Sequence, residues 1–145
     1  MKSINILKTA ILGCAVLFSS CAKDNEPQTS PSETGLFYAE NGTSTLIKAD
    51  EALANKQYKT IIAKKNNNTL IEIVLTDLKT GTYPLTAKYA FTYVKDGKNW
   101  ESTAGTLSIT KIEDNKLSGT FKATAGSGIS GISSVEGKFN DIPVK

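Results

Sequence analysis

From Gly35 onward, apolar and polar residues alternate with a period of two, and this pattern limits the possible folds more than any other feature of the sequence. Successive side chains point to opposite faces of a β-strand, so alternation gives each strand one apolar and one polar face. The apolar positions of the clearest segments are Ile71, Ile73 and Leu75, then Leu107 and Ile109, then Leu117, Phe121 and Ala123, and finally Val135 and Phe139. The sequence therefore predicts an all-β domain of about eight strands, folded as an antiparallel β-sandwich or a filled β-barrel.

Polar turn signals separate the predicted strands. These signals are Asn-Gly at 41–42, Asp-Gly at 96–97, and the polar segments 66–68 and 113–115. Asn-Gly and Asp-Gly suit a type I′ turn, because both central residues of that turn need positive φ. Residues 50–57 are the only segment predicted to be helical, for one or two turns, with Asp50 as the N-cap.

The residue types that are missing exclude much enzyme chemistry. The chain contains 17 Lys, 14 acidic residues and two Cys, but neither His nor Arg. Without His there is no Ser-His-Asp triad, no Cys-His nucleophile and no imidazole base. Cys14 and Cys21 alone do not supply a zinc ligand set of the usual Cys/His kind. The sequence therefore predicts a non-enzymatic protein with no cofactor and no metal.

Residues 1–20 have the pattern of a secretory signal peptide. The apolar run at 10–18 is shorter than the roughly 18 residues that a transmembrane helix needs. Residues 17–21 (Leu-Phe-Ser-Ser-Cys) resemble the lipobox of bacterial lipoproteins, in which the Cys is lipidated and becomes the first residue. We therefore expect Cys21 to carry acyl chains such as palmitate and to anchor the protein to a membrane. A secreted protein with an incidental Cys after its signal is the alternative.

Residues 21–34 join the predicted anchor to a single predicted domain at 35–145. After Cys21 this segment contains two Pro and almost only polar residues, a composition typical of a flexible tether. Residues 23–26 (Lys-Asp-Asn-Glu) resemble the short Lys/acid signals that send lipoproteins of Bacteroidota to the outer face of the outer membrane. A charged, solvated linker explains them equally well. The sequence therefore predicts an outer-membrane anchor and leaves surface-exposed and periplasmic locations both open.

The charge balance bears on the partner. Without residues 1–20, which hold two of the 17 Lys, the chain has 15 Lys against 14 acids. Nucleic acid binding depends on basic side chains, so a nearly neutral protein without Arg is not expected to bind nucleic acid. We expect a monomeric domain that meets the membrane through Cys21 and has a glycan or protein partner.

Segments of the second half of the chain carry a family resemblance. Residues 105–125 (GTLSITKIEDNKLSGTFKATA) and 135–142 (VEGKFNDI) resemble the ending of a domain-of-unknown-function family of small Bacteroidota envelope lipoproteins. Residues 81–86 (GTYPLT) and Tyr89 fit the middle of that family. The resemblance implies an envelope lipoprotein with an all-β domain and no established activity.

Three classes of function remain. The first choice is a binding module for a glycan, a peptide or a protein. A lipocalin-like carrier of a small apolar ligand needs a barrel around a cavity, and a carboxylate-dependent hydrolase needs two acids across a cleft. Glu72 is the acid that lies among apolar residues, beside Leu70 and Val74 on the face of its strand opposite to residues 71 and 73. A solvated strand position explains Glu72 as well.

The segment from Tyr89 to Trp100 is the candidate recognition surface. Tyr89, Phe91 and Tyr93 alternate along one predicted strand, and Trp100 has polar neighbours, as a half-exposed ring near a turn would have. We expect Trp100, with Tyr89 and Tyr93, to contact a ligand, because such rings supply much of the energy at interfaces. The alternative is that Tyr89, Phe91 and Tyr93 form a core face or a cross-strand aromatic ladder.

Overall fold

The computed structural model describes residues 33–145. The predicted signal peptide (1–20), the lipidation site Cys21 and the tether with its Lys/acid segment (23–26) lie outside the described residues, apart from the last two tether positions. Within the described range, no helix has the length and apolar character needed to cross a membrane.

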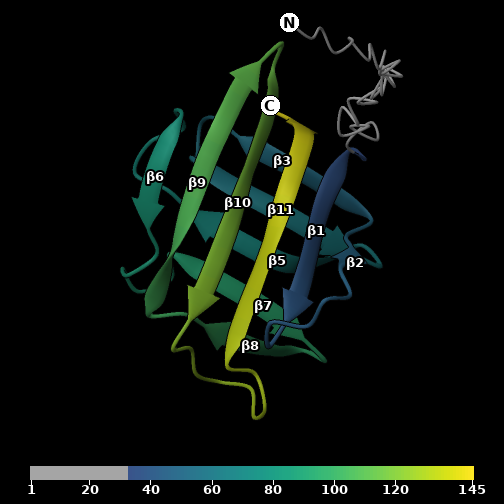
Figure 1. The fold of residues 1–145 in the computed structure, drawn as a ribbon, viewed down its shortest axis with the longest axis vertical. Coiled ribbons are helices and arrows are strands. Elements are labelled where there is room, and N and C mark those ends of the chain that lie inside the picture. The colour runs from purple at the N-terminus through teal and green to yellow at the C-terminus, as the bar shows by residue number, and fades with distance from the viewer. Residues whose placement is uncertain (1–32) are drawn as a thin grey trace, which may run out of the picture. The chain divides into compact units, whose positions relative to one another are not determined.

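The described chain forms two antiparallel sheets (Figure 1). The six-stranded sheet contains, in spatial order, β2 (Ile47–Lys48), β1 (Gly35–Glu40), β11 (Ser134–Pro143), β10 (Lys116–Thr124), β9 (Ala104–Glu113) and β6 (Gly81–Pro84). The five-stranded sheet contains β3 (Glu51–Asn55), β4 (Thr60–Lys65), β5 (Asn68–Val74), β7 (Phe91–Lys95) and β8 (Lys98–Glu101). Figure 1 shows the six-stranded sheet in front and the strands of the other sheet crossing behind it at a steep angle.

This arrangement confirms an all-β antiparallel sandwich and settles the choice against a filled barrel, because the strands form two separate sheets. Residues 33–145 form eleven strands, where about eight were expected. The short edge strands β2 and β6, of two and four residues, account for part of the excess. Segments this short carry too little alternation to be recognised from the sequence.

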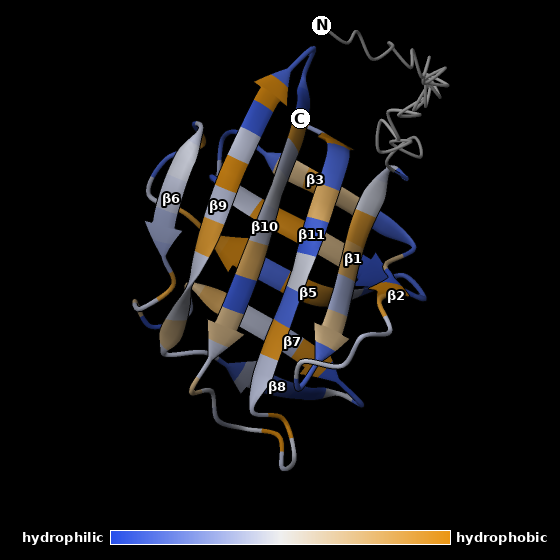
Figure 2. Cartoon of the chain, viewed as in Figure 1, coloured by the Kyte–Doolittle hydropathy of each residue, from blue (hydrophilic) through white to orange (hydrophobic). Residues whose placement is uncertain are grey.

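The predicted alternation places the core correctly on the long strands. Figure 2 shows apolar and polar bands alternating along β9, β10 and β11. All predicted inward positions on the four clearest segments are buried: Ile71, Ile73, Leu75, Leu107, Ile109, Leu117, Phe121, Ala123, Val135 and Phe139. The two sheets therefore bury one shared core between them, as a sandwich requires.

Strict alternation fails at Leu70. Leu70 is buried, although the alternation placed it opposite to Ile71. The register between β4 and β5 shifts at this point, because Ala63 pairs with Ile71 while Lys64 pairs with Thr69. Leu70 is the extra residue of a β-bulge, and the bulge turns two successive side chains inward.

The predicted helix at 50–57 is also wrong. Residues 51–55 form β3, which pairs with β4 along its whole length. Ala54 is fully buried, so the short apolar side chains of this segment serve the sheet core. Asp50 caps no helix, because its carboxylate accepts the backbone N–H of Asn66 at 2.7 Å. Pairing with a neighbouring strand overrides the weak helix propensity of so short a segment.

Three large aromatic rings lie directly against glycines. A Cβ at Gly119 would lie 2.5 Å from the ring of Phe139, and one at Gly137 would lie 2.8 Å from Phe121. A Cβ at Gly126 would lie 2.1 Å from the indole of Trp100. These glycines are required because the rings occupy the space that a side chain would need.

Short segments cover the outer strands of the five-stranded sheet. Beside β3, Val144 forms a bridge with Ala54, and the backbone N–H of Lys145 donates to the Ala54 carbonyl at 2.8 Å. Beside β8, Glu101 and Ser127 exchange two backbone hydrogen bonds of 3.0 Å. Both outer strands of this sheet therefore have part of their backbone paired.

Candidate functional site

A pocket of about 840 Å³ lies where two hairpins of the five-stranded sheet meet the end of β1. We call it the hairpin pocket. Its lining comes from Tyr38 and Glu40 of β1, Ile47 of β2, residues 65, 66 and 68–70 of the β4–β5 hairpin, and residues 93–97 of the β7–β8 hairpin. It therefore draws on both sheets of the sandwich.

Two tight turns form the rim of the hairpin pocket. Asn66 and Asn67 have φ of 50° and 61°, and Asp96 and Gly97 have φ of 51° and 72°. Positive φ at both central residues is what a type I′ turn needs, so the turn predictions at both sites are confirmed. Such turns match the twist of the strands they join, and their polar side chains are therefore held at defined places on the rim.

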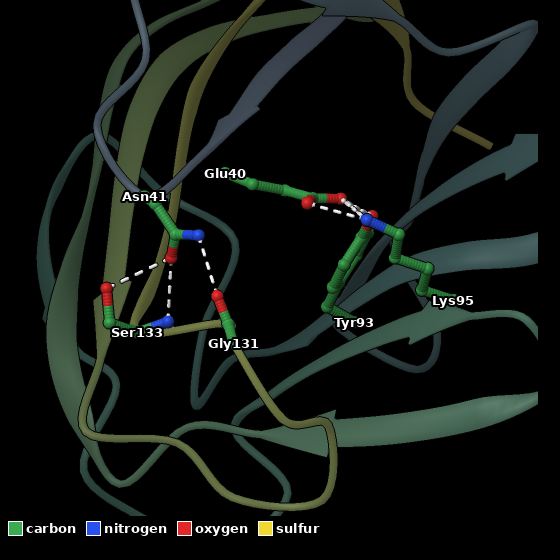
Figure 3. Close-up of polar contacts among 6 residues, drawn as sticks. All are labelled: Glu40, Asn41, Tyr93, Lys95, Gly131 and Ser133. Atoms are coloured by element: carbon green, nitrogen blue, oxygen red, sulfur yellow. Dashed lines mark hydrogen bonds and ion pairs between the residues drawn. The ribbon is translucent and has the colours of Figure 1, made fainter.

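An ionic and hydrogen-bonded cluster joins the two sheets at the pocket (Figure 3). Glu40 comes from β1, whereas Tyr93 and Lys95 come from β7. The Tyr93 hydroxyl donates to Glu40 Oε1 at 2.5 Å, and Lys95 Nζ donates to Glu40 Oε1 and Oε2 at 3.0 and 2.7 Å. The carboxylate is therefore held by three donors in a single position.

The electrostatics of this cluster fix its protonation. Partial burial of Glu40 opposes its ionisation, but the hydrogen bonds from Lys95 and Tyr93 outweigh burial and hold the carboxyl pKa below its ordinary value. Burial and the bond to Glu40 raise the pKa of the Tyr93 hydroxyl, and the bond to Glu40 raises the pKa of Lys95. At neutral pH the three groups are fixed donors and acceptors. They are not tuned for proton transfer, which needs a pKa near the working pH.

A second polar contact in Figure 3 fastens the loop between β10 and β11. Asn41 Nδ2 donates to the carbonyl of Gly131 at 2.8 Å, and Asn41 Oδ1 accepts from the backbone N–H of Ser133 at 2.7 Å and from its Oγ at 3.0 Å. The turn at 41–42 has positive φ at both residues, as predicted. Asn41 therefore holds the loop against the end of β1, directly after Glu40.

Trp100 does not lie where the sequence suggested. The ring is 0% exposed, so the expectation of a half-exposed ring is wrong. The loop 125–133 covers it: Gly126 lies against the indole, and Trp100 Nε1 donates to the carbonyl of Ile132 at 3.0 Å. Of its polar neighbours, Lys98 and Asn99 are exposed but Ser102 is buried as well, and the covering loop is distant in sequence. Trp100 in this conformation packs the core and offers no ring to a ligand.

The other candidate aromatic residues separate into two groups. Phe91 and Tyr93 are buried, as the core alternative stated, and Tyr93 packs against Tyr38 with ring centroids 5.7 Å apart. Tyr89 does not share their strand, because it lies in the turn before β7 with a φ of 66°. It is 53% exposed. Of the three predicted ligand contacts, Tyr93 lines the hairpin pocket, Tyr89 lies elsewhere, and Trp100 is enclosed.

Tyr89 lines a second, smaller hollow of about 370 Å³, which we call the Tyr89 groove. Its other lining residues are mostly apolar and include Val74, Leu75, Tyr83 and Pro84. Lys88 Nζ lies 4.7 Å from the centre of the Tyr89 ring, a cation–π contact. The groove lies beyond the end of β5 opposite to the hairpin pocket.

Other chemistry is sparse in the described part of the chain. Residues 33–145 hold no group of three or more acidic, His or Cys side chains able to bind a metal ion. Glu72 is half-buried on β5, between Ile62 of β4 and Thr92 of β7, and its place in the ladder gives it uncharged neighbours on both sides.

Glu40 and Lys95 were missed by the sequence analysis. Each directly precedes a predicted turn, at 41–42 and 96–97, and they carry opposite charges. That coincidence is the only available signal, because 55 positions separate the two residues and their contact depends on how the sheets pack.

The chain matches a known family model over most of its length. No curated protein and no solved structure matches it. A family model described as a domain of unknown function (DUF6252) matches residues 32–143, which covers nearly all of the described sandwich. The resemblance to an uncharacterised family is thereby confirmed, whereas the lipid anchor and the bacterial group stay predictions. The chain belongs to the DUF6252 family.

Proposed function

We propose that this protein is a lipid-anchored lipoprotein of the cell envelope whose β-sandwich is a non-enzymatic binding module. The observation that carries the binding role is the hairpin pocket. Its volume of about 840 Å³ is in the range of small-molecule sites, and it combines apolar lining with a few fixed polar groups. The anchor rests on the lipobox-like residues 17–21 and on the apolar run before them.

The non-enzymatic part of the proposal rests on the cluster at the pocket. The lowered pKa of Glu40 makes it a poor general acid, and the raised pKa of Tyr93 makes it a poor base. A carrier role is less well supported, because a free apolar ligand would desolvate the Glu40–Lys95 pair in the pocket.

The binding role is tested by a pull-down of the tagged, lipidated full chain from its own envelope. Wild type is compared with Lys95→Met, which keeps most of the side-chain volume but removes the ammonium group. The proposal requires a captured component that the Lys95→Met variant loses at least tenfold. The matched control is Lys122→Met, which removes the partner of Glu136 in a similar ion pair of 2.8 Å outside this pocket. Equal capture by wild type and Lys95→Met contradicts binding at this pocket.

The anchor is tested separately. Cys21→Ser is expected to move the protein out of the detergent-extracted lipoprotein fraction, because the acylated thiol is the proposed anchor. Protease treatment of intact cells then reports the exposed face. Digestion before lysis supports the outward signal at 23–26, and protection until lysis contradicts it. Normal fractionation of Cys21→Ser contradicts the lipid anchor itself.

A further inference from the structure

The hairpin pocket has a charge pattern that points to one ligand class. Its lining carries two positive groups, Lys65 and Lys95, and two negative groups, Glu40 and Asp96. Lys95 is paired with Glu40 at 2.7 Å, and Lys65 lies 3.4 Å from Asp50 just outside the lining. The opposite charges offset each other at short range, so the pocket favours neither an anion nor a cation.

The polar lining also disfavours apolar ligands. A fatty acid chain would remove water from the ion pair without replacing its hydrogen bonds, which is unfavourable. Asn66, Asn68 and Thr69 add uncharged donors and acceptors to the same lining. The ligand that fits must therefore be polar and uncharged, and it must carry several hydroxyl or amide groups.

The backbone around the pocket separates a sugar from a peptide. Peptides that extend a sheet bind through unpaired backbone groups of an edge strand. Where they line the pocket, β5 and β7 no longer pair with each other: residues 68–69 pair only with β4 and residues 94–95 only with β8, and the bulge at Leu70 interrupts β5. These unpaired stretches are too short and irregular to extend the sheet with a peptide strand. The pocket therefore recognises a ligand mainly through side chains, which suits the hydroxyl groups of a sugar.

The Glu40–Lys95 pair supplies the specific contact. A carboxylate only accepts hydrogen bonds and an ammonium only donates them, whereas each hydroxyl of a sugar does both. Lys95 uses two of its three donors on Glu40, and Glu40 Oε2 accepts from Lys95 alone among the described side chains. An adjacent donor and acceptor therefore remain for two neighbouring hydroxyls. Lys95 is 41% and Glu40 20% exposed in their side chains, so both groups reach the solvent.

From these observations we infer that the hairpin pocket binds a neutral glycan, with the Glu40–Lys95 pair holding a vicinal diol of one sugar unit. This inference rests on the proposed binding function and names its ligand class. Tyr38 and Tyr93 are nearly buried, so they form a fixed wall and not a stacking platform. Ile47, which is 40% exposed, offers the apolar contact for the C–H face of the sugar.

The inference is tested on the lipidated full chain in detergent with an immobilised glycan array. The array holds neutral glucans, mannans, xylans and galactans, with polygalacturonate as the anionic arm, and laurate and a random peptide library are measured beside it. We expect binding to at least one neutral glycan, and loss of that binding after periodate treatment, which cleaves vicinal diols. Binding confined to the anionic, lipid or peptide arms, or to no neutral glycan, overturns the inference.

Two variants locate the site. Lys95→Met and Glu40→Gln are each expected to weaken glycan binding at least tenfold, while Lys122→Met and Glu136→Gln leave it unchanged. Melting curves show whether each variant is folded. If Glu40→Gln does not fold, the result for Lys95→Met decides. Loss of binding in all four variants, or in none, overturns the assignment to the pocket. If the envelope pull-down captures a protein that Lys95→Met loses while every neutral glycan fails, the binding function stands and the ligand class is wrong.

Discussion

The hairpin pocket and the Tyr89 groove lie at opposite ends of the same strand pair. One end of this pair, at residues 68–70 and 93–95, lines the pocket, and the other end, at Val74 and Ala90, lines the groove. The side chains of Ile71, Ile73, Phe91 and Tyr93 are buried along the pair. At the pocket, an ion pair and a phenol fix each other across the two sheets, whereas the groove is lined mainly by apolar side chains and an exposed ring. The comparison teaches that one rigid core can present two unlike surfaces, of which only the first has preset polar geometry.

The largest expected loss of stability comes from a change in the core that lies between the pocket and the groove. Phe91 is fully buried between Trp100 and Phe121, with ring centroids 6.2 and 5.6 Å apart. Phe91→Ala is expected to lower the free energy of unfolding by about 3 to 5 kcal/mol, through lost burial and the cavity left behind. Urea denaturation followed by Trp100 fluorescence measures it. A decrease in the free energy of unfolding below about 1 kcal/mol would show that the Phe91 ring does not stabilise the core between the pocket and the groove.

The next effect is confined to the hairpin pocket. Glu40→Ala leaves the nearly buried Tyr93 hydroxyl without its acceptor, and we expect it to cost about 1 to 3 kcal/mol of stability. Adding Tyr93→Phe to Glu40→Ala should not lower stability further, because it removes the hydroxyl that lost its acceptor. A double-mutant cycle in urea measures the coupling. Additive effects of the two changes would contradict a direct bond.

The pocket end also predicts a loss of stability in acid, whereas the lining of the groove contains no carboxylate. The folded-state pKa of Glu40 lies below its ordinary value of 4.5, so its stabilisation is present above that value and is lost as pH falls through the lowered pKa. The pKa of Lys95 lies above its ordinary 10.5, so its stabilisation is present below that value and is lost as pH rises through the raised pKa. The stability difference between wild type and Glu40→Gln should therefore shrink in acid. A difference that is constant from pH 7 to pH 2 would contradict this.

The smallest effect is expected at the groove. Tyr89→Ala removes a ring that is 53% exposed, and we expect a change in stability within about 0.5 kcal/mol. Glycan binding at the hairpin pocket should not change. A large destabilisation would mean that the groove end is as constrained as the pocket end.

The sequence was informative where a signal is local and uninformative where it depends on packing. Alternation identified Leu107, Phe121 and Phe139 as core, because period two follows directly from strand geometry. Turn chemistry identified 41–42 and 96–97, because positive φ selects Asn, Asp and Gly. Each of these features is determined by a few consecutive residues.

The failures have non-local causes. Trp100 is buried because loop 125–133 folds over it, and the residues next to Trp100 in sequence do not indicate this contact. The segment 50–57 is a strand because β4 is available to pair with it. The Glu40–Tyr93 bond joins residues 53 positions apart on different sheets. The candidate site was therefore only partly predictable: its turn and Tyr93 were named, whereas Glu40 and Lys95 were not.

The covered edge at β3 has a consequence for self-association of the protein. An open edge strand invites pairing with another chain, which is the first step of ordered aggregation. Val144 and Lys145 occupy that position beside Ala54, and the Lys145 carbonyl also accepts the backbone N–H of Lys56 at 2.7 Å. Val144 and Lys145 thus cover part of this edge against pairing with another chain. Removing these two residues would leave the backbone of Ala54 unpaired on that side and favour ordered association through the open edge.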